Sequence, residues 1–132
     1  MIDPAGCLNA LEAGARRANE LRIAVVIAIV DASGVPVALL RMPGSFLASL
    51  DYAQDKAWTS ASFSMPTAAF GDVLDGMEEP VRQDLLAHRR VTRLPGGVPY
   101  RLDGKLLAGI GVSGGTGEQD EACANAALSA LA

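Results

Sequence analysis

A continuous apolar run near the beginning of the sequence constrains the fold more than any other feature. Ile23-Ala-Val-Val-Ile-Ala-Ile-Val30 is rich in β-branched residues and shows no alternation of apolar and polar positions. Such residues favour strands, and a strand without alternation is covered on both faces. The run has the length of a strand and is too short to cross a bilayer. We therefore predict a central strand with protein packed on each side of it.

The remaining patterns predict an order of helices and strands. Asp3-Pro4 is typical of a helix N-cap followed by a first-turn proline, and helical spacing continues to about Leu21. The turn Asp31-Ala-Ser-Gly34 joins the apolar run to a second strand, and we expect Asp31 to accept hydrogen bonds from the turn amides. Asp103-Gly104 is a second hairpin turn signal, which leads into a strand from Lys105. A long helix is expected to begin at Ser45 or Ser49, either of which can cap it, and to be interrupted at Pro66-Thr67. Further helices are expected over Thr67–Leu74, Glu79–Ala87 and Glu118–Leu131. The other strands are expected over Val35–Arg41, Val91–Leu94, Val98–Leu102 and Lys105–Ser113.

This order predicts the fold class. With every strand connection a tight turn or a helical segment, residues 1–132 form one α+β domain. Its sheet is expected to be antiparallel, with about five strands flanked by helices. Two-sided burial of the apolar run in a chain with only 5% aromatic residues also predicts a homo-oligomer, from dimer to octamer, with the C-terminal or the long central helix at the interface.

Gly109, Gly111 and Gly114 spell G-x-G-x-x-G, the pattern of dinucleotide-binding loops. That loop requires its glycines to follow a strand, whereas the first two lie inside an apolar run here. The helix that follows begins with Glu118, Asp120 and Glu121, which suit the helix dipole but would repel a pyrophosphate. We therefore interpret these glycines as backbone features of a strand and its exit turn.

Charge and composition exclude several classes of function. A net charge of −4 with scattered Lys and Arg argues against a nucleic-acid surface. The start of the chain lacks the basic and apolar regions of a signal peptide, so we expect a cytoplasmic protein without a membrane partner. Cys7 and Cys123 lie among apolar neighbours and are expected to be small core residues. One histidine cannot build a zinc site, and no metal site is predicted.

Four segments, taken in order, resemble one known family. They are Val30-Asp-Ala-Ser-Gly34 with Leu39-Leu-Arg-Met-Pro-Gly44, then Lys56-Ala-Trp-Thr-Ser-Ala61 with Met65-Pro-Thr67, then Leu94-Pro-Gly-Gly-Val-Pro99, and finally Gly109-Ile-Gly-Val-Ser-Gly-Gly115 with Gln119-Asp-Glu121. The chain thus resembles the GlcG/HbpS-like haem-binding family, which includes the C-terminal domain of PduO-type proteins. The resemblance implies a profilin-like sheet of five antiparallel strands with flanking helices, and homo-oligomers. Some members bind, sense or degrade haem, and others have no agreed role.

Three residues are candidates for catalysis. Lys56 lies in an otherwise apolar helical segment, so its ammonium either reaches solvent, forms a structural ion pair or points into a cleft with a carboxylate partner. Arg41, at a strand end, is either an ordinary surface charge or a bidentate anchor for a carboxylate or haem propionate. Glu121 and its neighbour Asp120 stabilise the last helix through its dipole, or act as a general acid.

His88 is the only histidine and the obvious haem ligand by its chemistry, although it lies outside the four matching segments beside Arg89-Arg90. Met42 and Thr67 are further candidate ligands, as are Met65 and Met77. Our leading hypothesis is a protein that binds haem, or another anionic planar ligand, at a subunit-interface pocket that includes Arg41.

Two other classes of function stay open. The chain could be a cofactor-free isomerase, lyase or hydrolase acting on a small organic acid, with Lys56 transferring protons and Arg41 holding the carboxylate. This hypothesis requires a small polar pocket containing Lys56. A structural or partner-binding oligomer is the third hypothesis.

Overall fold

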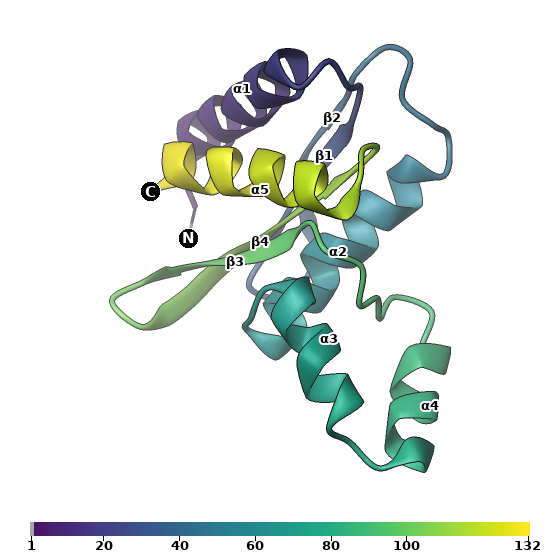
Figure 1. Ribbon diagram of the computed structural model, residues 1–132. Helices are drawn as coiled ribbons and strands as arrows, with labels where there is room; N and C mark the ends of the chain where they lie inside the picture. Colours follow the sequence, from purple (N-terminus) through teal and green to yellow (C-terminus); the bar gives the residue numbers. More distant parts are fainter. Residues whose placement is uncertain (1) are drawn as a thin grey trace.

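The computed structural model describes residues 2–132 as one sheet with helices on both faces (Figure 1). The elements in chain order are α1 (Pro4–Glu20), β1 (Val26–Asp31), β2 (Pro36–Arg41), α2 (Ser49–Phe63), α3 (Thr67–Asp75), α4 (Glu79–Ala87), β3 (Gly97–Leu102), β4 (Lys105–Ser113) and α5 (Gly117–Leu131). Among the described residues, no helix is long and apolar enough to cross a membrane. The predicted α+β class is confirmed.

The sheet is antiparallel throughout, with the strand order β2-β1-β4-β3. Both hairpins use the turns that the sequence predicted. Oδ1 of Asp31 accepts hydrogen bonds from the amides of Ser33 and Val35, and Asp103 and Gly104 turn with φ of 52° and 77°. The two hairpins meet at the centre, where Val26 of β1 faces Ser113 of β4.

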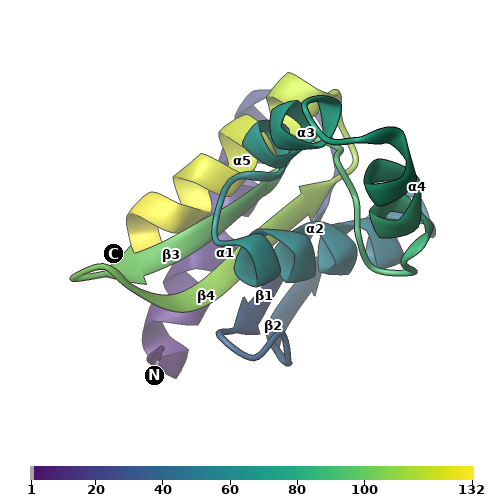
Figure 2. The same ribbon diagram turned by 90° about the horizontal axis from the view of Figure 1, so that it is seen from below.

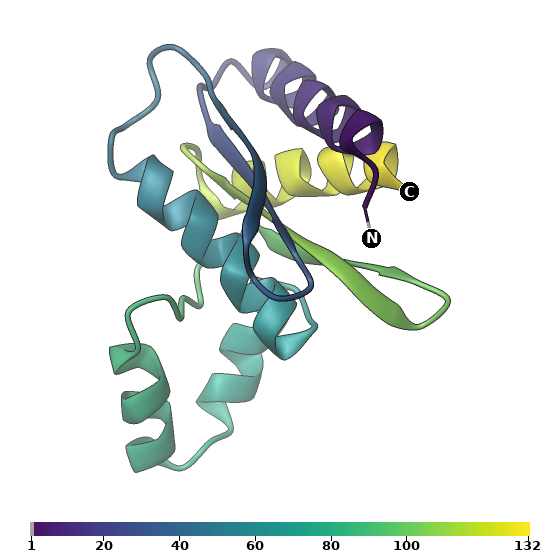
Figure 3. The same cartoon turned by 180° about the vertical axis from the view of Figure 1, so that it is seen from behind.

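Helices α1 and α5 lie side by side on one face of the sheet, and α2 covers the other (Figures 1 and 3). The β1 residues Val26 to Val30 are therefore buried on both faces, with at most 2% exposure. The prediction of two-sided cover is confirmed. Its use as an argument for an oligomer was wrong, because the helices of this one chain supply the cover.

The face under α1 and α5 is packed with branched side chains. Ile27 and Ile29 of β1 meet Ile110 and Val112 of β4, together with the small residues of the two helices. Cys7 and Cys123 belong to this layer as buried, free thiols, as predicted. Packing here follows the usual interdigitation of aliphatic side chains.

The face under α2 is packed with very small residues. Ala53, Ala57 and Ala61 lie against β1 and β4. A Cβ at Gly109 would lie 2.3 Å from the carbonyl oxygen of Ala57, and a Cβ at Gly111 would lie 1.9 Å from that of Ala53. The G-x-G pattern therefore serves close contact between a helix backbone and a strand, which confirms its interpretation as a backbone feature.

Two sequence predictions were wrong. The sheet has four strands instead of about five, because Val91–Leu94 is not a strand. Side-chain hydroxyls bind its backbone instead: Oγ1 of Thr59 accepts from the Thr92 amide, and Oγ1 of Thr92 accepts from the Leu94 amide. Neither Ser45 nor Ser49 caps α2, whose N-cap is Ala48 without a side-chain hydrogen bond.

Helices α3 and α4 form an arm at the end of the molecule opposite the β3–β4 turn (Figure 2). Helix α4 contains no buried residue. Arg82 fixes it by donating to the carbonyl of Met77 at 3.1 Å, and Arg93 clamps Asp75 at the end of α3 with two bonds of 2.8 Å. This arm carries the loop that presents His88.

Candidate functional site

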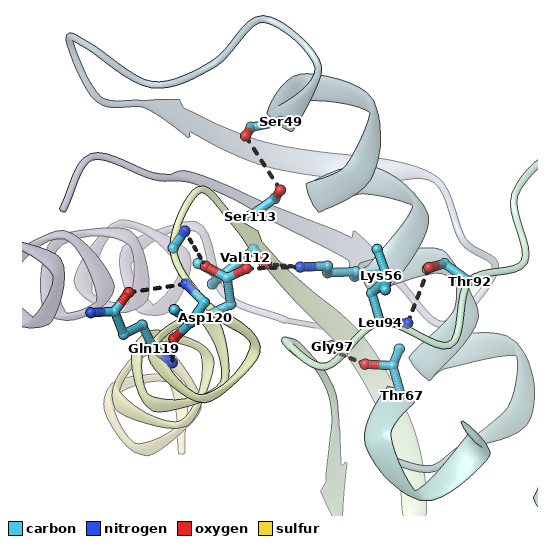
Figure 4. Close-up of polar contacts among 12 residues, drawn as sticks. Ser49, Lys56, Thr67, Thr92, Leu94, Gly97, Val112, Ser113, Gln119 and Asp120 are labelled. Carbon is cyan, nitrogen blue, oxygen red and sulfur yellow. Dashed lines mark hydrogen bonds and ion pairs between the residues drawn. The ribbon is translucent and has the colours of Figure 1, made fainter. Parts of the chain in front are cut away.

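A buried ion pair joins the helices on opposite faces of the sheet (Figure 4). Lys56 of α2 and Asp120 of α5 have side chains only 3% and 5% exposed, and Nζ lies 3.0 Å from Oδ2. Nζ also donates to the carbonyl oxygen of Val112 at 2.8 Å. An ammonium has three donors, so these two contacts leave one N–H. The structure thus shows Lys56 with a carboxylate partner and not extended to solvent.

The first turn of α5 holds Asp120 in place. Thr116 and Gln119 form a reciprocal capping box at the start of the helix. The second carboxylate oxygen of Asp120 accepts the Gly115 amide at 2.8 Å. Both carboxylate oxygens of Asp120 therefore accept hydrogen bonds, and these hold the carboxylate in place beside Lys56.

The position of Lys56 alters its acid–base chemistry. Burial lowers the pKa of the ammonium from its ordinary value, and the charge and hydrogen bond of Asp120 oppose this effect. Desolvation disfavours the charged form of an amine, and a neighbouring carboxylate favours it. A lowered lysine pKa is found both in lysines that act in catalysis and in structural ion pairs.

Lys56 and Asp120 line a cavity of about 260 Å³ at the end of β4. The loop between α4 and β3 closes one side through Leu94 and Pro95, and Gly96 passes over the ammonium. Its φ is +121°, and a Cβ there would lie 3.1 Å from Nζ and 2.7 Å from the Val112 oxygen. The other lining residues are Tyr52, Ser113, Gly115 and Gly117.

Sequence reasoning assigned Asp120 to the helix dipole and missed its pairing with Lys56. The signal was present in the helical period. Asp120 lies three, four and seven residues before Cys123, Ala124 and Ala127, all of which are buried. A carboxylate on the buried face of a helix requires a buried partner, and Lys56 is the only lysine that an apolar helix could supply.

A second polar region lies on the outer side of α2, around His88. The His88 ring is exposed and stacks on Trp58, with 5.1 Å between ring centroids and 14° between planes. Its Nδ1 accepts the Arg90 amide at 3.2 Å, and the Arg90 guanidinium lies 5.5 Å from the Trp58 ring centroid. The histidine ring is therefore oriented from two sides, with Nε2 directed away from that amide bond.

A cavity of about 440 Å³ lies beside this stack. Its apolar lining includes Tyr52, Leu86 and Val91, and its charged lining includes Asp51, Asp55 and Arg89. Burial raises the pKa of the Asp55 carboxyl, an effect that Arg90, 3.9 Å away, opposes. The rest of the lining is Ala48, Ala87, His88 and Thr92.

The other predicted site residues lie apart from both cavities. Arg41 is exposed at the end of β2, and the half-buried Met42 packs against the core under α1 and α5. Thr67 is completely buried, and its hydroxyl oxygen accepts the Gly97 amide at 3.0 Å. Glu121 is half-buried on α5 and is not among the residues that line the Lys56 cavity. Within one described chain, the four proposed haem-contacting residues thus do not form a single site.

The sequence matches the family model described as "Haem degrading protein HbpS-like" over residues 2–129. It is 34% identical over 119 residues to the corrinoid adenosyltransferase PduO of Salmonella typhimurium. This match covers 90% of this chain and 35% of that protein. The chain therefore spans about a third of the length of the PduO relatives that it matches.

Two crystal structures have nearly the same fold. The Klebsiella pneumoniae protein ORFY has 29% identity and a TM-score of 0.90, over 98% of this chain and 90% of that one. The PduOC:heme complex has 32% identity and a TM-score of 0.90, over 98% of this chain and 94% of that one. One of the similar folds is thus a complex with haem.

Proposed function

Because the chain belongs to the HbpS-like family, we propose that it binds haem, with Nε2 of His88 as an iron ligand. The observation that carries the proposal is the match to this haem-related family over residues 2–129, supported by the similarity to a protein crystallised with haem. His88 is the only histidine in the sequence and is exposed on the surface.

The surroundings of His88 have the features that such a ligand requires. Nδ1 of His88 already accepts a hydrogen bond from the Arg90 backbone amide, so Nε2 is the nitrogen left to bind iron. Stacking on Trp58 fixes the plane of the ring. Leu86 and Val91 offer apolar contacts to a porphyrin, and Arg89 offers a cation to a propionate. A cavity of about 440 Å³ is within the range of small-molecule sites. A histidine-ligated haem would supply redox and oxygen chemistry.

The test is a titration with haemin followed by absorbance in the Soret region. We expect His88→Ala to weaken binding at least tenfold and to change the Soret band. Gln83→Ala, on the exposed side of α4, is the matched control and is expected to bind haemin as the unmodified protein does. Equal spectra and affinities for His88→Ala and the unmodified protein would rule out His88 as the ligand.

We further propose that the chain forms a homo-oligomer and that the haem site is completed at the subunit interface. Arg41, which lies away from the His88 cavity in one chain, would come from a second copy. Large apolar side chains are exposed on β2 and the loop after it, with Leu39 42%, Phe46 69% and Leu47 79% exposed. Large exposed apolar side chains are a feature of surfaces that bind other proteins. A light-scattering mass equal to the 13.6 kDa monomer at micromolar concentration would contradict this proposal.

The cavity of Lys56 supports a second function of a different class. We propose that the chain is a cofactor-free catalyst for a small organic compound, with Lys56 transferring a proton. The buried Lys56 lines a cavity of about 260 Å³, which suits a small molecule. Arg41 is not among its lining residues, so a carboxylate anchor from that residue is not part of this proposal.

Proton transfer can be tested without knowing the physiological reaction. In deuterated buffer, the protein is incubated with a panel of small ketones and oxo acids, and exchange at the carbon next to the carbonyl is followed by NMR. We expect catalysed exchange for at least one compound and its loss in Lys56→Met. No exchange above the buffer rate across the panel would count against this function.

A further inference from the structure

We propose that the Lys56 cavity takes a small, uncharged aldehyde or ketone, and that Lys56 forms an imine with its carbonyl carbon. This inference rests on the second function proposed above and specifies its substrate class and its covalent step. It concerns a region distinct from the His88 cavity, whose lining shares only Tyr52 with it.

The charges around the cavity favour an uncharged ligand. The Lys56 ammonium is the only cation among the lining residues, and Asp120 compensates it at 3.0 Å. An anionic ligand would therefore gain little here and would face the Asp120 carboxylate.

The polar groups that remain free favour a carbonyl oxygen. Nζ uses two of its three donors for the Val112 carbonyl and Asp120, so one N–H is left for a ligand oxygen. The walls formed by Leu94, Pro95 and the two glycines at positions 115 and 117 offer no charged group. A short carbon chain on the carbonyl compound would contact Leu94 and Pro95.

The ion pair supplies the proton transfers that imine formation requires. Asp120 first accepts a proton from the ammonium, which leaves a neutral amine with a lone pair. The amine nitrogen then bonds to the carbonyl carbon, and a proton passes from this nitrogen to the carbonyl oxygen, which becomes a hydroxyl. Asp120 returns its proton to that hydroxyl, which leaves as water. The ammonium and the carbonyl compound together give a protonated imine and one water molecule. Asp120 ends as a carboxylate again, and no oxidant or reductant is needed.

Two features of the site support this step. Burial favours the neutral amine, which is the nucleophile. Asp120 is held by the Gly115 amide at 2.8 Å and by the capping box of α5, so the proton acceptor has a fixed position beside Nζ. A lysine beside a fixed acceptor, in a cavity lined by apolar walls, combines the groups that imine chemistry uses.

The composition of the chain makes a direct test possible. The sequence contains only two lysines, Lys56 and Lys105, and Lys105 is exposed at the start of β4. The folded protein is incubated with propanal and sodium cyanoborohydride near neutral pH, which reduces each imine to a stable secondary amine. Peptide mass spectrometry then follows the modification of each lysine over time.

We expect Lys56 to be modified at least tenfold faster than Lys105 in the folded protein, and the two to react alike in urea. A lysine with a purely structural role would be protected by its burial and would react more slowly than Lys105. That result would overturn the inference, and the comparison needs no variant.

Two variants test the part assigned to Asp120. Asp120→Asn removes the proton acceptor and is expected to slow trapping at Lys56 at least tenfold relative to Lys105, under conditions where circular dichroism shows the fold intact. Glu118→Gln, on the exposed side of the same helix turn, is the matched control and should leave the ratio unchanged. Trapping at Lys56 that is equally fast in Asp120→Asn would remove Asp120 from the mechanism. Because trapping reports on the amine itself, its failure is distinguishable from a failure to find proton exchange.

Discussion

The two faces of the sheet are packed in different ways. Under α1 and α5, Ile27, Ile29 and Ile110 interdigitate with helix side chains, whereas under α2 the helix backbone approaches Gly109 and Gly111 directly. The first face can adjust to small changes through side-chain movement. The second cannot, because backbone carbonyls are in contact with the strand. The face that lacks bulky side chains is also the one whose helix carries Lys56 and Trp58, so the rigid packing positions both candidate sites.

The largest expected effect concerns the ion pair that joins the helices of the two faces. Lys56→Met leaves the Asp120 carboxylate buried without its partner and should lower the free energy of unfolding by about 3 to 5 kcal/mol. The double variant Lys56→Met, Asp120→Leu should recover most of this loss, since an apolar pair of similar volume is often neutral. Urea unfolding measures both. A loss below about 1 kcal/mol in the single variant would mean that the two layers do not depend on this pair.

Neighbouring residues on β4 allow the two packing modes to be compared by one methyl group each. Gly111→Ala adds a methyl whose carbon would lie 1.9 Å from the Ala53 oxygen, and should cost about 3 kcal/mol or more. Ile110→Val removes a methyl on the opposite face and should cost about 1 kcal/mol. Thermal and urea unfolding measure the loss of stability in each variant. A larger loss in Ile110→Val than in Gly111→Ala would contradict the distinction between the two faces.

The face under α1 and α5 also holds Cys123, whose thiol should make the free energy of unfolding depend on pH. Burial, with a smaller contribution from Asp120, raises the pKa of the Cys123 thiol from its ordinary value of 9.0 to about 11. The unfolded chain therefore loses this proton at lower pH than the folded one. The stabilisation is fully present below pH 9.0 and is lost as the pH rises to about 11, with a size of about 2 to 3 kcal/mol.

Urea unfolding between pH 8 and 11 checks this dependence. Cys123→Ala should lose stability with rising pH less steeply than the unmodified protein. The raised pKa of Cys7 is expected to leave part of the slope in place. Identical slopes in the two proteins would show that the Cys123 thiol is more accessible than its burial indicates.

The smallest expected effect lies on the outer side of α2. Trp58→Leu removes the stack with His88 and should lower the free energy of unfolding by about 1 kcal/mol. Its effect on haemin affinity should be larger than its effect on stability, because His88 loses its fixed orientation. Phe63 of α2 and Phe70 of α3, another stacked pair, provide the control: Phe63→Leu should change stability but not haemin binding.

The sequence predicted most of the fold because its signals are local. The run from Ile23 to Val30, the turns at Asp31 and Asp103, and the prolines at helix starts each act over a few residues. Strand Lys105–Ser113 was predicted with its observed bounds. Val91–Leu94 failed because β-branched residues there are held by the hydroxyls of Thr59 and Thr92, and Thr59 lies far away along the chain.

The candidate sites were harder to predict because their partners are distant in sequence. Lys56 was identified as unusual from its apolar neighbours, but Asp120, 64 residues away, required the fold. The candidate haem-binding residues were chosen for their chemistry alone: Arg41, Met42, Thr67 and His88. No local sequence pattern predicts which of them line the same cavity. The stack of His88 on Trp58 joins a loop to a helix, and neither segment predicts the other.

The strand order β2-β1-β4-β3 also determines how this chain can fold in time. Each hairpin, β1–β2 and β3–β4, closes over a short turn, whereas the central ladder pairs Val26 with Ser113. Pairing across so long a loop carries a large entropic cost, so it is expected to limit the folding rate. On the ribosome, β1 must wait until β4 has been made, and its apolar face stays open during that interval. The apolar residues that make β1 the centre of the native sheet are thus the ones that a chaperone would have to cover first.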